Sequence, residues 1–320
     1  MNFNPIIIVG GEPQSIFIEI FLKAIRKKLK HPIILVSSID ILKKNVKKFK
    51  KNIKLNELNK DFSNIKKGEI NFVNVKYNKF SFSKKKITTI SNSYIEKSFK
   101  KALEIIKKKQ CSGLINGPIS KKSFLKGKYN GITEYLAKKT NAKNPVMLIY
   151  NKKLAVSPLT THIPISKVSK HVKKKDIIIK IKKINSFYKK YIKKKPRFGI
   201  TGLNPHCESF DKENKEKKEI IPAIKILKKN EININGPFAA DTIFLKENLK
   251  KFDVIFGMYH DQVLTPMKTL NNFNAINITL GLPFIRISPD HGPNVQMLGK
   301  NNSNPKSLIE SMLFFKKYEI

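Results

Sequence analysis

Three short motifs each place a histidine directly after an apolar, strand-like stretch. They are Thr160-Thr161-His162, Gly202-Leu203-Asn204-Pro205-His206 and Met258-Tyr259-His260-Asp261-Gln262, and the chain has six histidines in all. Three imidazoles that converge from strand ends would bind a metal ion and leave coordination positions open, which is the usual arrangement for metal-assisted chemistry. The spacing alone leaves a second interpretation open, in which each histidine is a separate capping or core residue.

Two carboxylates accompany these motifs. Asp261 directly follows His260, and Asp241 lies in Ala239-Ala240-Asp241-Thr242. A carboxylate beside a metal-bound imidazole fixes the tautomer and the orientation of the ring. We therefore expect Asp241 and Asp261 to support the histidines.

Arg286 is the second chemical signal, because the chain has only three arginines. A guanidinium binds carboxylate or phosphate through a planar fork that lysine cannot reproduce. Lys268 and Asn277 precede Arg286 in the same stretch and could add polar contacts to an anion. A structural salt bridge is the alternative role for Arg286.

The charge of the chain comes almost entirely from lysine. The formal net charge is +42 over 320 residues, and 62 of the 65 basic residues are lysines, spread along the whole length. Proteins that bind nucleic acids rely on arginine for bidentate contacts, so this composition argues against a nucleic-acid partner. A positive field is still expected to attract anionic substrates such as phosphorylated metabolites.

Other sequence signals narrow the class of protein. Cys111 and Cys207 form neither metal-ligand spacing nor a disulfide framework. No signal-peptide pattern and no apolar stretch of about 20 residues is present, so we expect a cytoplasmic protein without a membrane partner. No strand is followed by the G-x-G-x-x-G fingerprint of dinucleotide-binding domains.

The elements that must position these residues alternate between strand and helix. This alternation predicts an α/β fold with a largely parallel sheet, in which functional residues gather beyond the carboxyl ends of strands. The segment from about Asn52 to Lys86 is expected to be irregular, with strand-like pieces near Ile70 to Val75. The predicted strands are 6–9, 33–36, 113–118, 146–150, 153–156, 197–201, 254–258 and 274–279, and the main predicted helices are 93–109, 177–191, 220–229 and 307–318.

The motifs together resemble one enzyme family. The combination of the motifs that contain His206, Asp241 and His260 with Thr279-Leu280-Gly281-Leu282-Pro283-Phe284-Ile285-Arg286 is similar to the 4-hydroxythreonine-4-phosphate dehydrogenases of vitamin B6 biosynthesis. The likeness covers nearly the whole chain and is densest from Gly113 onward. It implies a two-domain α/β/α subunit like that of isocitrate and isopropylmalate dehydrogenases, with the active site in the interdomain cleft. We expect one domain over residues 1–135 plus 285–320 and the other over residues 136–284.

The resemblance also implies a cofactor set and site residues. It implies a homodimer with a divalent metal (Zn, Mg, Co, Mn or Ni) at the subunit interface, and NAD or NADP as the oxidant. The positions that match the metal ligands are His162, His206 and His260. The substrate positions are Ile132, Thr133, Lys268, Asn277 and Arg286, of which Ile132 stands where the family commonly has His. The segment Asp290-His291-Gly292, with Asn304 beyond it, resembles the loop that binds the adenosine part of the cofactor, and Lys268 and Asp241 are the catalytic candidates.

The expected reaction is NAD-dependent oxidation and decarboxylation of 4-phosphooxy-L-threonine to 3-amino-2-oxopropyl phosphate. This reaction belongs to pyridoxal 5'-phosphate biosynthesis. Two alternatives remain from the sequence: oxidation of a related four-carbon acid phosphate such as threonate or erythronate 4-phosphate, or a basic protein that binds nucleic acid.

Overall fold

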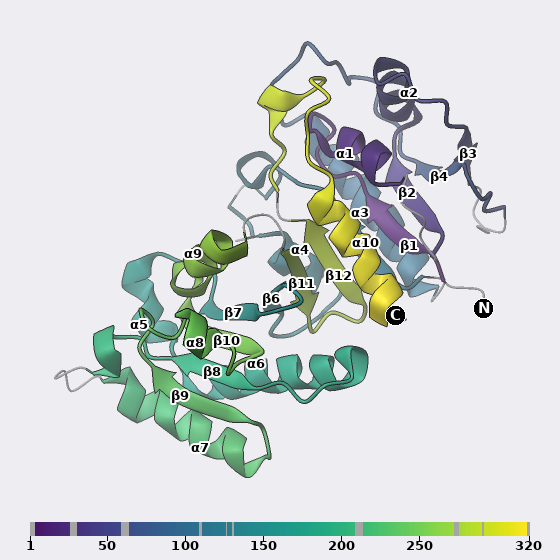
Figure 1. Cartoon of the computed structure of the whole chain (residues 1–320). Coiled ribbons are helices and arrows are strands. Elements are labelled where there is room, and N and C mark those ends of the chain that lie inside the picture. The colour runs from purple at the N-terminus through teal and green to yellow at the C-terminus, as the bar shows by residue number, and fades with distance from the viewer. Residues whose placement is uncertain are drawn as a thin grey trace. The chain divides into compact units, whose positions relative to one another are not determined.

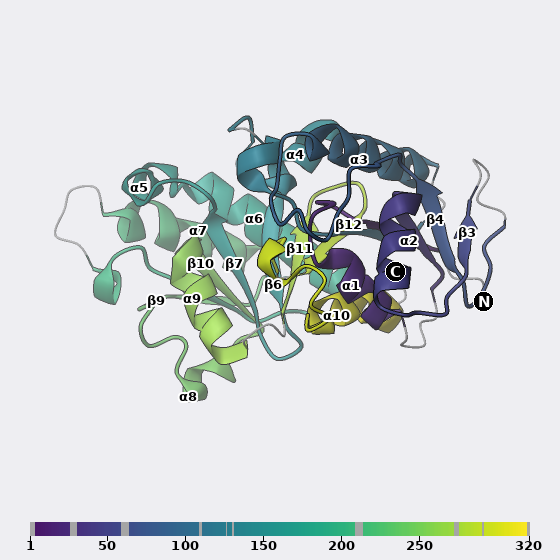
Figure 2. The ribbon, with the colours of Figure 1, turned by 90° about the horizontal axis from the view of Figure 1, so that it is seen from above.

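The computed structural model describes residues 4–25, 31–58, 64–108, 111–125, 127–129, 131–208, 214–271, 275–289 and 291–318. The chain divides into two compact units, one formed by Met1–Tyr135 with Phe284–Ile320 and the other by Leu136–Pro283. The division falls within helix α4 (Ile132–Lys139). Each unit is a layer of strands with helices packed on it, which confirms the predicted α/β fold (Figures 1 and 2).

Unit 1 is built on parallel strands in the order β3-β4-β2-β1-β5-β12. Strand β1 lies between β2 and β5, and its sequence Ile-Ile-Ile-Val is buried along its whole length, as expected for a central parallel strand covered on both faces. The strands are β1 (Ile6–Val9), β2 (Ile33–Ser37), β3 (Leu55–Glu57), β4 (Ile70–Asn74), β5 (Gly113–Asn116) and β12 (Ile285–Pro289). The long helices are α1 (Phe17–Ala24), α2 (Ile39–Lys48), α3 (Ser91–Lys107) and α10 (Lys306–Tyr318).

The helices of unit 1 cover both faces of its strands. Helix α3 packs on β1 and β2, while α10 packs on β12 and on α1. Figure 2 shows α3 on one side of the strands and α1 with α10 on the other. Ser38 is the N-cap of α2, because its hydroxyl accepts a hydrogen bond from the backbone N–H of Asp40 at 3.2 Å.

Unit 2 has a mixed arrangement, with strands in the order β11-β6-β7-β10-β8-β9. Strand β10 pairs in parallel with both β7 and β8, whereas β6 pairs antiparallel with β7 and β11. The strands are β6 (Val146–Tyr150), β7 (Ala155–Thr160), β8 (Phe198–Thr201), β9 (Ile234–Phe238), β10 (Val254–Tyr259) and β11 (Ile276–Leu280). The helices include α5 (Val168–His171), α6 (Lys174–Phe187), α7 (Ile221–Lys229), α8 (Lys246–Leu249) and α9 (His260–Asn271).

All the predicted strands and main helices are present, with shifts at their ends; Lys109 and Asn274 lie outside the described residues. The region expected to be irregular contains two short strands, β3 and β4. The structure adds strands β9 and β12 and helices α4, α5, α8 and α9, which the sequence patterns did not indicate. In the described part of the chain, no helix is long and apolar enough to span a bilayer.

Candidate functional site

The three histidines lie at one edge of the unit 2 sheet. Strand β10 lies between β7 and β8, all three run in parallel, and each ends shortly before a histidine: β7 before His162, β8 before His206 and β10 before His260. We call this feature the histidine edge. The placement agrees with the rule that functional residues of α/β sheets lie beyond the carboxyl ends of parallel strands.

His162 and His260 face each other across a small pocket. Their ring centroids are 5.8 Å apart with 39° between the ring planes. The pocket has a volume of about 250 Å³ and is also lined by Thr160, Tyr259 and Asp261, among others. These two imidazoles are close enough to act on a common ligand.

Asp261 fixes the tautomer of His260. The Nδ1 atom of His260 lies 2.6 Å from Oδ1 of Asp261. Because a carboxylate can only accept, Nδ1 donates in this pair, and in the neutral ring Nε2 then has the lone pair that a metal requires.

His206 lies on the same edge, but its ring is not part of the His162–His260 pair. It is an exposed residue in the single 3₁₀ turn Pro205–Cys207, which follows β8. Within the described ranges, no group of three His, Cys, Asp or Glu side chains is close enough together to hold a metal ion. The structure therefore brings together two of the three predicted ligands.

Two of these histidines have strained backbone. His162 has a φ of 25° and His206 a φ of 53°, and Cys207 follows with 61°. A non-glycine residue in this region costs about 1–3 kcal/mol and is retained mainly where a functional geometry requires it. In donor chemistry and in position on the sheet, the histidine edge fits a divalent ion, since neutral imidazoles suit Zn, Co, Mn or Ni.

Buried side chains beneath the histidine edge hold its strands together. The Gln262 side chain accepts from the Met258 backbone N–H at 2.7 Å and from the Thr201 hydroxyl at 2.8 Å, and it donates to the Gly202 carbonyl at 2.8 Å. The Thr160 hydroxyl donates to the Met258 carbonyl at 2.8 Å. Gln262 therefore joins the end of β8 to the β10–α9 turn, a role that the sequence analysis did not predict.

Glu216 holds the loop that leads to His206. Its carboxylate accepts from the backbone N–H groups of Leu203 and Asn204, both at 2.8 Å, and from the Asn204 side chain at 3.0 Å. Burial raises the pKa of Glu216, but these hydrogen bonds outweigh it and leave the pKa below its usual value. No sequence motif pointed to Glu216.

Arg286 is completely buried in unit 1, as the second residue of β12. Its Nε donates to Oδ1 of Asn116 at 2.7 Å, and its Nη1 donates weakly to the Thr133 hydroxyl at 3.4 Å. Burial lowers the pKa of Arg286, and the charge of Glu134 opposes that shift. We call Arg286, Asn116, Thr133 and Glu134 the arginine site; it contains two of the predicted substrate residues.

The other predicted residues of unit 2 lie on separate elements. Lys268 is exposed on α9, eight residues after His260, which is about 12 Å along a helix axis. Asn277 is half-buried in β11, opposite Ile149 of β6. Asp241 is exposed after β9, and its charge acts on Cys207, where burial is the main cause of a raised pKa.

The remaining predicted residues of unit 1 have local partners. Ile132 is the first residue of α4. The His291 ring stacks on Phe17 with centroids 6.1 Å apart, and its Nδ1 lies 3.1 Å from the carbonyl of Gly292. Asn304 accepts from the backbone N–H of Lys306 and so caps α10. Asp290 lies outside the described residues.

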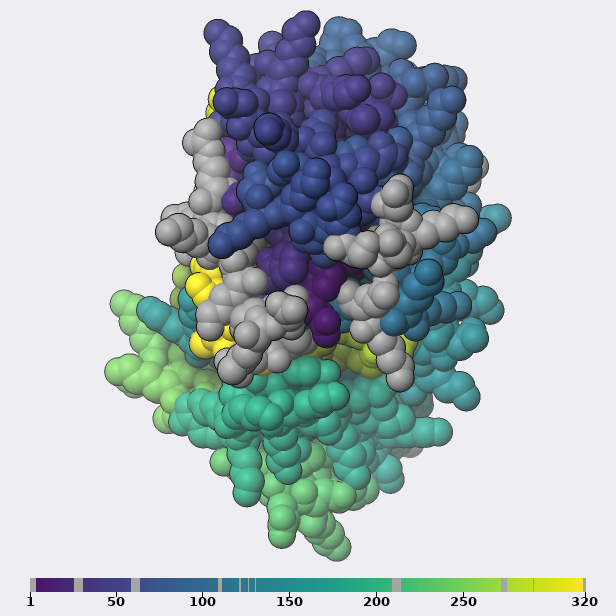
Figure 3. Space-filling view, turned by 90° about the vertical axis from the view of Figure 1, so that its right-hand side faces the viewer, coloured from purple at the N-terminus to yellow at the C-terminus, as the bar shows by residue number. Residues whose placement is uncertain are grey.

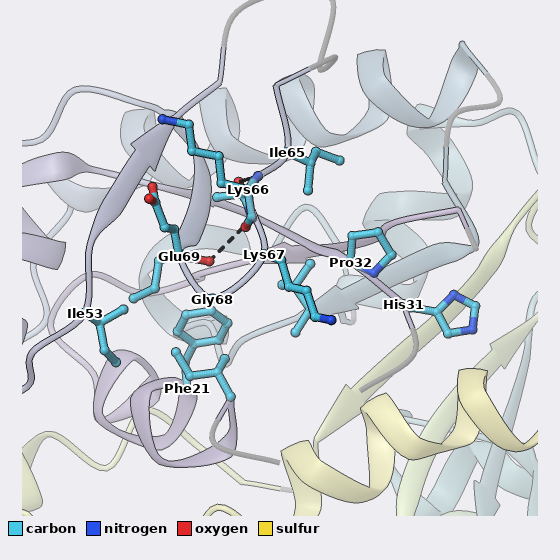
Figure 4. Close-up of a pocket in the computed structure, with 13 residues that line it drawn as sticks. Phe21, His31, Pro32, Ile53, Ile65, Lys66, Lys67, Gly68 and Glu69 are labelled. Carbon is cyan, nitrogen blue, oxygen red and sulfur yellow. Dashed lines mark hydrogen bonds between the residues drawn. The ribbon is translucent and has the colours of Figure 1, made fainter. Parts of the chain in front are cut away.

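A second pocket lies in unit 1, at the amino-terminal ends of β2 and β4. It is enclosed by residues just before β2 and β4 and by the end of α1, including Phe21, His31 and Ile70, and its volume is about 580 Å³. Figure 3 shows the residues around β3 and β4, in dark blue, on one surface of unit 1. Figure 4 shows the ammonium ends of Lys66 and Lys67 pointing in different directions, so the two lysines do not form a common anion site.

Comparison with known proteins identifies the family. Residues 28–314 match the family model described as pyridoxal phosphate biosynthetic protein PdxA. A 4-hydroxythreonine-4-phosphate dehydrogenase from Sulfurihydrogenibium sp. (strain YO3AOP1) is 38% identical over 95% of both chains. A protein from Oceanobacillus iheyensis, named provisionally as a D-threonate 4-phosphate dehydrogenase, is 28% identical over 98% of this chain and 97% of its own.

The fold of the family matches as well. The crystal structure of 4-hydroxythreonine-4-phosphate dehydrogenase from Klebsiella pneumoniae superimposes with a TM-score of 0.82 over 99% of this chain and 100% of that chain, at 23% identity. The resemblance inferred from the motifs is thereby confirmed, and the chain belongs to the PdxA family of pyridoxal phosphate biosynthetic proteins.

Proposed function

We propose that this protein is a metal-assisted, NAD(P)-dependent dehydrogenase of 4-phosphooxy-L-threonine, which is 4-hydroxythreonine 4-phosphate. In this reaction the secondary alcohol is oxidised to a ketone while NAD is reduced to NADH. The resulting β-keto acid loses carbon dioxide and gives 3-amino-2-oxopropyl phosphate. The observation that carries the proposal is that a chain matching the family over residues 28–314 keeps the rings of His162 and His260 5.8 Å apart, just beyond the carboxyl ends of parallel strands.

His162, His206 and His260 would hold the metal. A divalent ion bound there would act as a Lewis acid toward the alcohol oxygen of the substrate and the ketone oxygen of the product. The carboxylate of Asp261 would keep His260 in the tautomer whose Nε2 can bind the ion.

Arg286 would bind an anionic group of the substrate. Its guanidinium is buried, and its Nε is already held by Asn116, so the Nη edge can present a fork to phosphate or carboxylate. Thr133, at 3.4 Å from Nη1, would add a hydroxyl to the same anion. Lys268 and Asn277 would supply further polar contacts, and Lys268 and Asp241 are candidates for the proton transfers.

Further features of the proposal concern the cofactor and the assembly. NAD or NADP would be bound with help from the loop that contains His291 and Gly292 and from Asn304. The active protein would be a cytoplasmic homodimer with the metal at the subunit interface. The high lysine content would favour the approach of phosphorylated substrates.

A second candidate is a dehydrogenase of threonate or erythronate 4-phosphate. Two observations favour it: the name of the relative from O. iheyensis, and Ile132, which begins α4 next to Thr133 where the family commonly has His. An apolar side chain cannot donate a hydrogen bond to the substrate, so this position can alter which acid phosphate is preferred.

One assay separates these candidates. NADH or NADPH formation is measured with each of the three acid phosphates, before and after removal of metal by EDTA and after re-addition of Zn²⁺, Co²⁺ or Mn²⁺. We expect the highest kcat/KM on 4-phosphooxy-L-threonine, and loss of turnover in EDTA that added metal restores. A higher kcat/KM on a threonate or erythronate phosphate would select the second candidate, and full turnover in EDTA would rule out the metal-assisted mechanism.

A further inference from the structure

We infer that Asn116 is a positioning residue of the arginine site, and that its neutral amide aims the Arg286 guanidinium at an anion without cancelling the charge. This inference rests on the proposed function, because it assigns Arg286 to the phosphate or carboxylate of the substrate. Asn116 ends β5 and is 1% exposed, and Arg286 lies on the adjacent strand β12.

Asn116 is itself held in one orientation. Its Nδ2 donates to the carbonyl of Gly117 at 2.9 Å, so its Oδ1 must face Arg286. Gly117 is fixed in turn, because its backbone N–H donates to the carbonyl of Val9 at 2.7 Å. A Cβ at Gly117 would lie 2.5 Å from the carbonyl oxygen of Gly10. The Asn116 side-chain amide is therefore held by a backbone segment that packs against the end of β1.

The geometry of the guanidinium explains what this contact does. A guanidinium has five N–H donors in one plane, and two neighbouring nitrogens form each edge that an anion can grip. The 2.7 Å bond to Asn116 uses Nε. An anion that grips the other edge would contact Nη1 and Nη2, and the Thr133 hydroxyl lies 3.4 Å from Nη1.

The neutrality of the amide matters as much as its position. Arg286 is fully buried and already interacts electrostatically with the negative charge of Glu134. An aspartate at position 116 would have nearly the same shape and would accept the same bond more strongly. It would also give one buried guanidinium two carboxylates, and the substrate anion would then have to compete with both of them.

The test uses Asn116→Asp in the full-length, metal-loaded protein, with inorganic phosphate as the ligand probe. We expect the KM for the phosphorylated substrate to rise about 10-fold or more, which corresponds to about 1.4 kcal/mol of binding. We expect kcat to change by less than about threefold, because the substitution acts on binding of the anion more than on the reacting carbon. The rise in thermal midpoint that phosphate gives the wild type should be lost.

Two further variants separate positioning from stability. Asn71→Asp is the matched control, since Asn71 is another buried asparagine of unit 1 whose Oδ1 accepts two hydrogen bonds, from Lys66 and Asn56. It makes the same change in net charge and should leave KM and the phosphate effect unaltered. Asn116→Leu should weaken phosphate binding as well, but with a lower thermal midpoint in the absence of ligand, because the buried Nε of Arg286 loses its acceptor.

The outcomes are distinct. A purely structural role predicts that Asn116→Asp keeps the wild-type KM and phosphate effect, and that result would overturn the inference. An Asn71→Asp variant as impaired as Asn116→Asp would overturn it too, because the effect would then come from net charge. If the wild type oxidises none of the acid phosphates but still responds to phosphate, the proposed function fails while the phosphate measurements continue to test Asn116.

Discussion

The histidine edge of unit 2 and the arginine site of unit 1 illustrate two ways to hold functional side chains. His162 and His206 lie on loops with positive φ, and His206 is exposed, so their geometry is imposed by the backbone around them. Arg286 lies inside a parallel sheet, completely buried, and is oriented by hydrogen bonds to neighbouring side chains. Loss of a histidine should therefore reduce function without reducing stability, whereas loss of the Arg286 guanidinium should reduce both.

The strongest test of this contrast is His206→Gly. We expect the loss of an imidazole ligand to lower kcat/KM by about 1000-fold, or about 4 kcal/mol of transition-state stabilisation. Glycine accepts a φ of 53° without strain, so the free energy of unfolding should rise by about 1 kcal/mol. Steady-state kinetics and thermal unfolding measure the two effects.

His206→Ala is the control for this prediction, because alanine removes the imidazole but keeps the strained backbone. It should lose as much activity as His206→Gly without the gain in stability. Equal stability of the two variants would show that the loop is not strained, and wild-type activity of either would show that His206 is not a ligand.

The second prediction concerns Arg286→Lys, which keeps the charge but loses the planar fork. We expect kcat/KM to fall by about 100-fold, mostly through KM. Unlike the changes at His206, this one should also lower the free energy of unfolding, by about 2 kcal/mol, because Asn116 and Thr133 would keep only part of their buried hydrogen bonding. Denaturant unfolding of the variant beside the wild type checks the stability. A variant that loses activity at unchanged stability would remove the contrast between the two sites.

The sequence predicted the residues of both sites better than the contacts that hold them. The histidine motifs and the rare arginine could be recognised because residue type and local context carried the signal. Asn116 and Gln262 were missed because their hydrogen bonds join residues far apart in the chain: 170 positions separate Asn116 from Arg286 and 61 separate Thr201 from Gln262. Glu216 was missed because a glutamate in a lysine-rich stretch carries no signal for the loop, 12 and 13 positions away, that it holds.

The fold shows the same division between local and tertiary information. Strands such as β1 and β10 were predicted because they consist mostly of large apolar residues. Strand β3 has only three residues, and β9 contains a glycine and a proline, so neither shows a clear strand pattern. Strand β12 was missed because it contains an arginine, which is unusual in a buried strand. Its partner β5 lies far away in the sequence, so no local pattern indicates the pairing.

The third prediction tests whether the histidine edge also depends on buried support. Gln262→Met keeps the approximate volume but removes the bonds to Met258, Thr201 and Gly202. We expect metal affinity, measured by competition with a chromophoric chelator, to fall by about 10-fold, as for partners that orient metal ligands. Stability should fall by about 2 kcal/mol, since buried backbone and hydroxyl groups lose their partners.

Ser157→Ala is the matched control for Gln262→Met. Ser157 is fully buried in β7, and its hydroxyl donates to the Met147 carbonyl at 2.7 Å, so this variant also loses a buried hydrogen bond of the unit 2 sheet. It should lose some stability and no metal affinity. If both variants bind metal as the wild type does, Gln262 supports the sheet and not the ligands.

The smallest expected effect on activity is at Glu12 of unit 1, where we expect a change in stability alone. Glu12 follows β1 and is 1% exposed. Burial raises its pKa to about 7, against the opposing effects of hydrogen bonds from the Ser91 hydroxyl and the Gln14 backbone. Like Arg286, Glu12 is a buried ionisable group. Unlike Arg286, it has no role in the proposed reaction.

The sign of the pH effect follows from this raised pKa. Below the unfolded pKa of about 4.5, Glu12 is protonated in both states and costs nothing. As the pH rises from about 4.5 to about 7, the unfolded chain ionises while the folded protein keeps its proton, so stability from this group is lost across that interval. The variant Glu12→Gln should remain neutral throughout.

Denaturant unfolding at pH 5 and pH 8 measures the effect. The loss of stability with rising pH should be smaller in the variant than in the wild type, by about 2–3 kcal/mol at most, since each pKa unit corresponds to about 1.4 kcal/mol. Equal losses in the two proteins would mean that Glu12 ionises in the folded state as easily as in the unfolded chain. Burial in unit 1 would then shift the pKa of Arg286 without shifting that of every ionisable group in the same unit.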